Sequence, residues 1–358
     1  MPTAYEDALH LLAGTGPEYG EGVPNSGPIV ADSLVDLGRP HLVNDWIKEY
    51  SQRLEALPAT AVPISRENWR PALSDRNRTA DWGNFFHREL KQASWRIIIT
   101  DWMPRLASGM AGGTGFGLLR AAHAARNLTL EETQYCRAEL AEGLGYWSSY
   151  YLKLPGILST GATGNLTPLE ALTHIKWQHK KRPPEYDLVS QGLHGLSRFS
   201  PFAGVINLVH LPERPEDLIT ETTASMARVF LSNCSDPMKL VPFMLALMVP
   251  SSLRHLIPHL EQDTAITLVR YGWQFAGAMY AIYGRVNPAD SWEPPNTDKQ
   301  QLIEQACSSG HEYAVMFTAT CLREFALNPD DVYLAAASEG IRRLSAAQLI
   351  GPAGKPAS

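Results

Sequence analysis

An arginine and a histidine fall on one face of a predicted helix, beside an aromatic residue. Phe116, Arg120 and His123 are separated by steps of four and three, which place side chains together on an α-helix. The surrounding stretch is rich in Ala and Leu, so a buried Arg or His there needs polar partners. A histidine can transfer a proton near neutral pH. The pattern fits either a structural hydrogen-bond network, which composition alone favours, or the polar wall of a pocket.

Other chemically suggestive motifs are weaker. His255 and His259 have the spacing of two zinc ligands on a helix, but Pro258 lies between them and no third ligand follows in a recognisable motif. The segment Gly112–Gly117 lacks the spacing of a phosphate-binding loop, and we expect it to permit close packing where a helix begins. The sequence contains no nucleophile elbow, no HExxH motif and no cofactor-binding fingerprint.

Length and composition indicate a globular protein. The chain has 358 residues, of which 44% are apolar and 19% charged, and its net charge is −6. Such a chain can bury a large core, and its acidic balance disfavours nucleic acid as a partner. The four cysteines are scattered, as expected of free thiols in a reducing compartment. We predict one domain over residues 1–358, with about residues 1–24 and 345–358 loosely ordered.

The chain shows no sign of secretion or of membrane insertion. Its first twenty residues lack the basic and apolar regions of a secretory signal. The apolar stretch Thr264–Tyr283 contains Arg270, Gln274 and two glycines, so we interpret it as a buried core helix. We therefore expect a cytoplasmic protein without a membrane partner, and a homodimer is left open.

Helical periodicity dominates the elements that must position these residues. Strand signals are weak, with no long Val/Ile/Thr alternation and no Asn-Gly turn, so we predict an all-α fold. Thr129 and Glu132 have capping-box spacing before one helix, and Thr167-Pro168 begins another. A third pattern runs from Asp298 through Tyr313 and Met316 to Asn328-Pro329, which ends it.

Several sequence blocks occur together and in order between about Asn25 and Ala337. They are Asn25–Pro28, Asp81–Leu90, Trp95-Arg96, Trp102–Gly109, Gly117–Arg126, Glu139–Trp147, Leu152–Gly156, Leu253–Leu260, Glu312–Thr318 and Cys321–Glu324. In these blocks the chain resembles the questin oxidase-like family. The resemblance implies a helical domain around a buried pocket and a role in tailoring aromatic polyketides. One branch of that family is similar to non-heme iron dioxygenases, whose metal is held by histidines and a carboxylated lysine.

This chain departs from that iron-binding pattern. Where the resemblance implies a histidine or the lysine, the sequence has Ser26, Phe116, Leu245, Tyr313 and Met316. A ferrous site needs imidazole or carboxylate donors, and these side chains do not supply them. Among the matched histidines, His123 and His259 persist. The resemblance therefore implies that the iron site is lost, and we predict no cofactor.

These observations together predict a metal-independent tailoring enzyme that promotes ring formation or rearrangement of a hydrophobic, polyketide-like small molecule. Tyr313, His123 and Arg120 are the predicted catalytic residues. Tyr313 would donate a hydrogen bond, His123 would move a proton, and Arg120 would hold a carboxylate or orient His123. The predicted substrate-binding residues are Ser26, Phe116, Leu245, Met316 and His259.

Two alternatives remain. The chain could retain the oxidative chemistry of the questin oxidase type, either without a cofactor or at a rearranged metal site that uses His123, His259, His255 or His311. It could instead be a non-catalytic ligand-binding homologue, because apolar replacements suit core packing as well as ligand binding.

We predict that protein expressed with ample iron carries no stoichiometric metal, because five expected ligand positions hold residues with no usual nitrogen or carboxylate donor. Elemental analysis of the purified protein checks this. One iron per chain would contradict the metal-independent prediction and direct attention to the remaining histidines.

Overall fold

The computed structural model describes residues 3–159, 164–178, 189–293 and 297–350. Within these residues the only sheet is the two-residue antiparallel pair of β1 (Glu18–Tyr19) and β2 (Val23–Pro24), and the all-α prediction is confirmed. The helices are α1 (Ala4–Leu12), α2 (Gly27–Asp36), α3 (Val43–Ser51), α4 (Thr79–Gln92), α5 (Trp95–Leu106), α6 (Phe116–Leu130), α7 (Gln134–Ser149), α8 (Pro168–Leu172), α9 (Val189–Gly195), α10 (Pro215–Asn233), α11 (Leu240–Ser252), α12 (Gln262–Tyr283), α13 (Lys299–Ser308), α14 (Glu312–Leu327) and α15 (Val332–Ile350).

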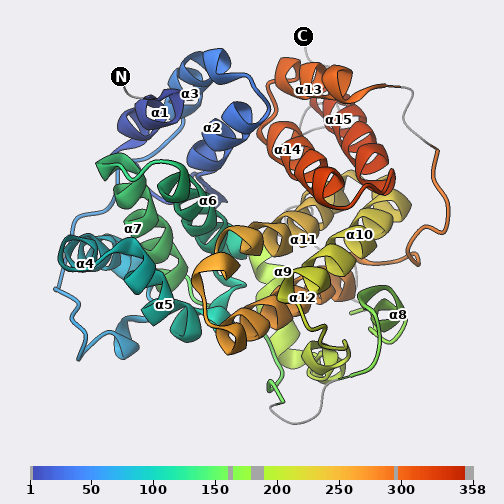
Figure 1. Ribbon diagram of the computed structural model, residues 1–358, viewed down its shortest axis with the longest axis horizontal. Coiled ribbons are helices and arrows are strands. Elements are labelled where there is room, and N and C mark those ends of the chain that lie inside the picture. Colours follow the sequence, from blue (N-terminus) through green and yellow to red (C-terminus); the bar gives the residue numbers. More distant parts are fainter. Residues whose placement is uncertain (1–2, 160–163, 179–188, 294–296, 351–358) are drawn as a thin grey trace.

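The apolar helix α11 lies in the middle of the molecule (Figure 1). Its residues from Pro242 to Ser252 are all buried, and α6, α10, α12 and α14 pack around it. By length and composition alone the stretch 237–259 could cross a membrane, but 83% of its most apolar window is buried within the fold. The stretch examined in the sequence, Thr264–Tyr283, is the buried core helix α12, as predicted.

Local capping signals located one helix start correctly and another wrongly. Thr167 caps α8 and forms a capping box with Glu170, as predicted. Thr129 instead lies in the last turn of α6, where its hydroxyl donates to the Ala125 carbonyl, and the cap of α7 is Thr133. Two threonines four residues apart compete for the same role, and the length of α6 decides between them.

The predicted helix from Asp298 to Asn328 is two helices, which corrects the sequence prediction. Asp298 caps α13 in a capping box, but Gly310 adopts a positive φ of 66° that ends this helical segment. A new helix, α14, begins at Glu312 with His311 as its N-cap. The break matters for function because it places Glu312 and Tyr313 in a first helical turn instead of a helix interior.

The N-terminal segment contains a capped helix. Thr3 caps α1, whose residues Tyr5, Ala8 and Leu9 are buried against α2 and α3. Burial of this apolar face supplies the stabilisation that composition did not reveal. At the other end α15 continues to Ile350, and the rest of the predicted loose C-terminal segment lies outside the described residues.

Three helices that surround the interior run in the same direction. Ser26, the N-cap of α2, contacts Glu312 at the start of α14, and Asp36 at the end of α2 contacts Arg323 near the end of α14. The ring of Phe116 at the start of α6 lies against Tyr313, and Arg126, ten residues on, also binds Asp36. With a rise of about 1.5 Å per residue, the paired ends are separated by about 15 Å in each helix.

A glycine allows α6 to lie directly against α7. A Cβ on Gly117 would come within 2.5 Å of the Trp147 backbone nitrogen, and the predicted packing role of the Gly112–Gly117 segment is confirmed. This contact holds the α6 face that carries Phe116 and His123 against the rest of the fold.

We expect Gly117→Ala to destabilise the protein by about 1–3 kcal/mol, because backbone atoms of α7 must move to admit the methyl group. Urea unfolding measures this free energy. Gly204→Ala is the matched control, since its Cβ would meet no atom within 4 Å and its φ of −81° suits any residue. Equal effects of the two substitutions would contradict the close contact.

Candidate functional site

The N-terminal ends of α2 and α14 meet at a partly buried carboxylate, Glu312. The Ser26 hydroxyl donates to Glu312 Oε2 at 2.5 Å and lies 3.2 Å from the Tyr50 hydroxyl. The backbone N–H of Ser26 also donates to the Tyr50 hydroxyl oxygen, at 2.9 Å. Burial raises the pKa of Glu312, although Ser26 and Arg53 oppose the shift. We call this group the Glu312 end of the interior.

Tyr313 lies beside this carboxylate and faces the interior. Its ring meets that of Phe116 edge-on, with centroids 6.4 Å apart. Burial, with the charge of Glu312 next, raises the pKa of Tyr313 well above its usual value, so the phenol keeps its proton. Within the described residues its hydroxyl makes no hydrogen bond. Tyr313 is therefore a neutral donor without an acceptor, as its predicted role requires.

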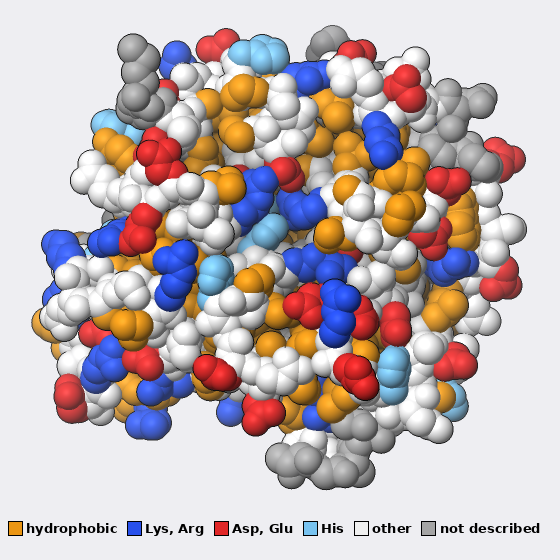
Figure 2. Space-filling model, viewed as in Figure 1, with side chains coloured by type: hydrophobic (Ala, Val, Ile, Leu, Met, Phe, Trp, Pro, Cys, Tyr) orange, Lys and Arg blue, Asp and Glu red, His pale blue; other side chains and the backbone are white. Residues whose placement is uncertain are grey.

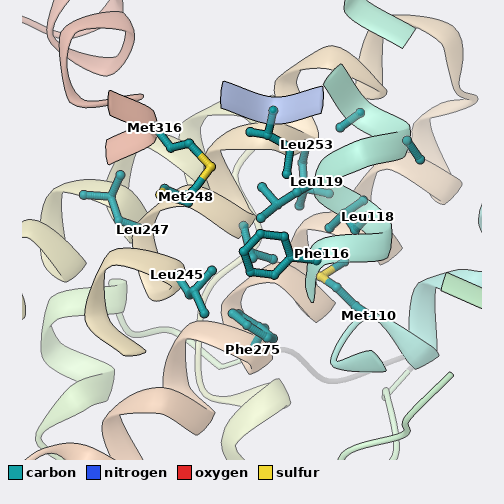
Figure 3. Close-up of a cluster of buried hydrophobic side chains, with 14 of the residues drawn as sticks. Met110, Phe116, Leu118, Leu119, Leu245, Leu247, Met248, Leu253, Phe275 and Met316 are labelled. Carbon is teal, nitrogen blue, oxygen red and sulfur yellow. The ribbon is translucent and has the colours of Figure 1, made fainter. Parts of the chain in front are cut away.

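Beyond the Glu312 end the interior is apolar and tightly packed. Figure 3 shows Phe116, Leu245 and Met316 in one cluster of hydrophobic side chains from α6, α11 and α14. Each is 1% exposed, so the cluster is shielded from solvent. Their predicted role in substrate binding requires this cluster to open. Met316 and its neighbour Met248 suit such a change because methionine side chains are flexible.

A histidine–aspartate pair lies further along α6, on the C-terminal side of Phe116. His123 Nδ1 lies 2.6 Å from Asp32 Oδ2, and both side chains are buried. Burial opposes ionisation of Asp32, but His123, Arg126 and Asn127 outweigh it and hold the pKa of this carboxyl well below its usual range. The carboxylate can only accept, so Nδ1 carries the proton and Nε2 has the free lone pair. No hydrogen bond to this Nε2 occurs within the described residues.

A second histidine and two arginines complete this group, which we call the His123 end. The His255 ring lies 5.7 Å from that of His123, between centroids. Arg126 binds both Asp32 and Asp36, while Arg323 donates to Asp36 at 3.0 Å. Burial, with the charge of Arg323 next, lowers the pKa of His255 well below its usual value, so it is neutral at pH 7.

Two predicted site residues lie elsewhere. Arg120 forms a buried two-point ion pair with Glu139 of α7, with nitrogen–oxygen distances of 2.6 and 2.7 Å, and its guanidinium makes no hydrogen bond to His123 in the described structure. His259 packs edge-on against Trp95 and lies 3.3 Å from the hydroxyl of Thr129. Thr129 is thirteen residues from Phe116, or about 20 Å along α6. Arg120 and His259 therefore lie apart from the Glu312 end and from the hydrogen bonds of His123, and their predicted roles stay predictions.

The five positions at which the resemblance implies metal ligands do converge. Ser26 and Tyr313 lie at the Glu312 end, and Phe116 joins Tyr313 to the cluster of Leu245 and Met316. Their hydroxyl, phenyl, isobutyl, phenol and thioether groups do not fit a ferrous ion. Within the described residues no group of three or more His, Cys, Asp or Glu side chains is arranged to hold a metal.

Sequence analysis missed the partners that give these residues their chemistry. Asp32, Glu312 and Arg323 come from distant segments, and no local pattern links them to His123, Ser26 or His255. One signal was present for Glu312, because Gly310 precedes it and a glycine inside a helical pattern indicates a C-cap.

Comparison with known proteins adds no relative. The chain matches no protein-family model, and no curated protein matches it either. The resemblance to the questin oxidase-like family therefore stays a prediction from the sequence blocks.

The partly buried Glu312 predicts a dependence of stability on pH. A carboxyl whose pKa is higher in the folded state binds its proton more tightly there, so its contribution to stability falls as pH rises from its ordinary value of 4.5 through the raised value. We expect Glu312→Gln to lack this loss. The unfolding free energy of the variant minus that of the wild type then increases with pH.

Urea unfolding at a series of pH values above 4 measures this difference. Glu304→Gln is the control, because the Glu304 side chain is 62% exposed. A constant difference between Glu312→Gln and the wild type would show that Glu312 titrates normally.

Proposed function

We propose that this protein is a metal-independent tailoring enzyme of polyketide-type secondary metabolism, which promotes ring formation or rearrangement by proton transfer from a carbon acid. The observation that carries the proposal is the buried Asp32–His123 pair with its free Nε2. Histidine held by a carboxylate through Nδ1 is the arrangement of a general base, because the carboxylate sets the tautomer and stabilises the imidazolium.

The chemistry follows from these groups. His123 Nε2 removes a proton from the carbon next to a carbonyl, and the resulting enolate attacks a second carbonyl of the same molecule. The new carbon–carbon bond leaves an alkoxide, which recovers the proton from His123. Asp32 is a positioning residue that stays ionised throughout, consistent with its low pKa. Holding the two carbons in contact supplies a further part of the acceleration.

The interior supplies complementary surfaces for such a substrate. Tyr313 packs against Phe116, which precedes His123 by seven residues, or about 10 Å along α6. The apolar cluster lies between Tyr313 and His123. An extended aromatic or polyketone body that displaced the methionines would reach both groups. Tyr313, a neutral donor without an acceptor, would then bind a distal carbonyl oxygen.

One observation favours the oxidative alternative. His123 and His255 lie with their rings 5.7 Å apart, and His255 makes no hydrogen bond in the described structure. Two such imidazoles would supply two ligands of a metal site, although His259 and His311 lie away from them, at Trp95 and at the N-cap of α14. Metal analysis separates this alternative from the proposal.

The test is turnover of linear poly-β-ketones and anthrone-type compounds, with product formation followed by mass spectrometry. We expect His123→Ala to lower the rate about 10²- to 10⁴-fold, the usual contribution of a general base, and added imidazole to restore part of it. Asp32→Asn should lower the rate and shift its pH profile, since the amide no longer sets the tautomer.

His210→Gln is the matched control, because His210 also pairs with a carboxylate, Glu221 at 2.8 Å, but is partly exposed and lies outside the site. It should turn over like the wild type. Full activity of folded His123→Ala would overturn the assignment of the base. Ligand binding without turnover by the wild type would support a non-catalytic homologue.

A further inference from the structure

Two buried nitrogen atoms at the His123 end have no hydrogen-bond partner among the residues that the structure describes. Arg323 donates from Nη2 to Asp36, but its Nε is buried and unpaired, and the same holds for Nε2 of His255. A buried polar atom left unpaired costs about 1–3 kcal/mol. Two of them on neighbouring side chains indicate a binding site for a polar group of a ligand.

The hydrogen bonds of the surrounding groups show what that group must be. Asp32 already accepts from His123, Arg126 and Asn127, and Asp36 accepts from Arg126 and Arg323. The adjacent Glu324 accepts from Ser251, Thr223 and two nitrogens of Arg254. The carboxylates are thus satisfied while Arg323 has a spare donor and His255 has two free nitrogens. The missing partner is an acceptor, and beside a guanidinium an oxyanion fits best.

The position of these groups indicates what else the ligand carries. The side chains of Arg126, Arg323 and Asp36 are 21%, 14% and 24% exposed, so they form a rim open to solvent. Figure 2 shows arginine or lysine and histidine side chains gathered near the centre of this face, over the junction of α2, α6 and α14. Below the rim, α14 continues from Arg323 to Met316 and into the apolar cluster.

We infer that Arg323 and His255 bind the oxyanion of an amphipathic ligand, a carboxylate or a phosphate monoester, whose hydrophobic body extends towards the apolar cluster. The inference rests on the proposed function in one respect, since it makes the substrate of that site an anionic polyketide-like molecule. Binding can be measured without turnover, so the two can fail separately.

Isothermal titration calorimetry at low ionic strength compares three probes: 2-naphthoate, its methyl ester, and 2-naphthyl phosphate. We expect the anions to bind about tenfold or more tightly than the neutral ester, which is the range expected for a hydrogen bond to a charged group. The tighter of the carboxylate and the phosphate identifies the natural headgroup. Equal binding of the ester and both anions would overturn the inference.

Arg323→Gln should abolish the preference for the anions and leave binding of the ester unchanged. His255→Gln is the second variant, in case loss of the Asp36 contact prevents folding of the first, and it should reduce the same preference. Arg342→Gln is the control, because Arg342 pairs with Glu339 and its side chain is 59% exposed. A preference retained in both folded site variants would contradict the assignment.

The His123→Ala variant distinguishes the two proposals. Binding of 2-naphthoate with loss of turnover supports both. Retained turnover with an intact preference for anions would reject His123 as the base and keep the anion site.

Discussion

The arrangement of polar and apolar groups in the interior depends on the parallel packing of α2, α6 and α14. Ser26 joins Glu312 at one end, and Asp36 joins Arg126 and Arg323 about 15 Å away. Parallel helices bring like dipole ends together, which is unfavourable. Here a carboxylate lies at the positive N-terminal end and two guanidinium groups lie towards the negative C-terminal ends, so the charges offset the dipoles. The same ion pairs that align the helices therefore also determine where polar chemistry can occur.

This arrangement makes the interior polar at both ends and apolar between them. The Glu312 end supplies a neutral donor, since burial keeps the proton on Tyr313. The His123 end instead supplies a base, because Asp32 stays ionised among three donors. Unpaired buried nitrogen atoms of Arg323 and His255 weaken the folded state.

Sequence periodicity predicted the helices well where each is decided locally. The buried stripe of α12 and the capping box of α8 follow from side-chain spacing and from the backbone donors of a first turn. The start of α7 and the break at Gly310 were missed because the local sequence allows two structures at each of these places. Thr129 and Thr133 can both cap a helix, and an apolar pattern continues in phase across the Gly310 turn. Which solution forms depends on the packing of α6 and α14 against other helices.

The sequence by itself determined that the chain is α-helical, that Phe116, Arg120 and His123 share a face, and that the side chains expected to hold iron are absent. Only the tertiary structure decided which of these residues act together. Helical spacing gives the direction of a side chain but not its contacts. In the structure Arg120 pairs with Glu139, whereas His123 pairs with Asp32 of α2. Contacts such as Ser26 with Glu312, 286 residues apart, arise from the packing of whole helices. Their pKa shifts arise from burial, which no local sequence pattern encodes.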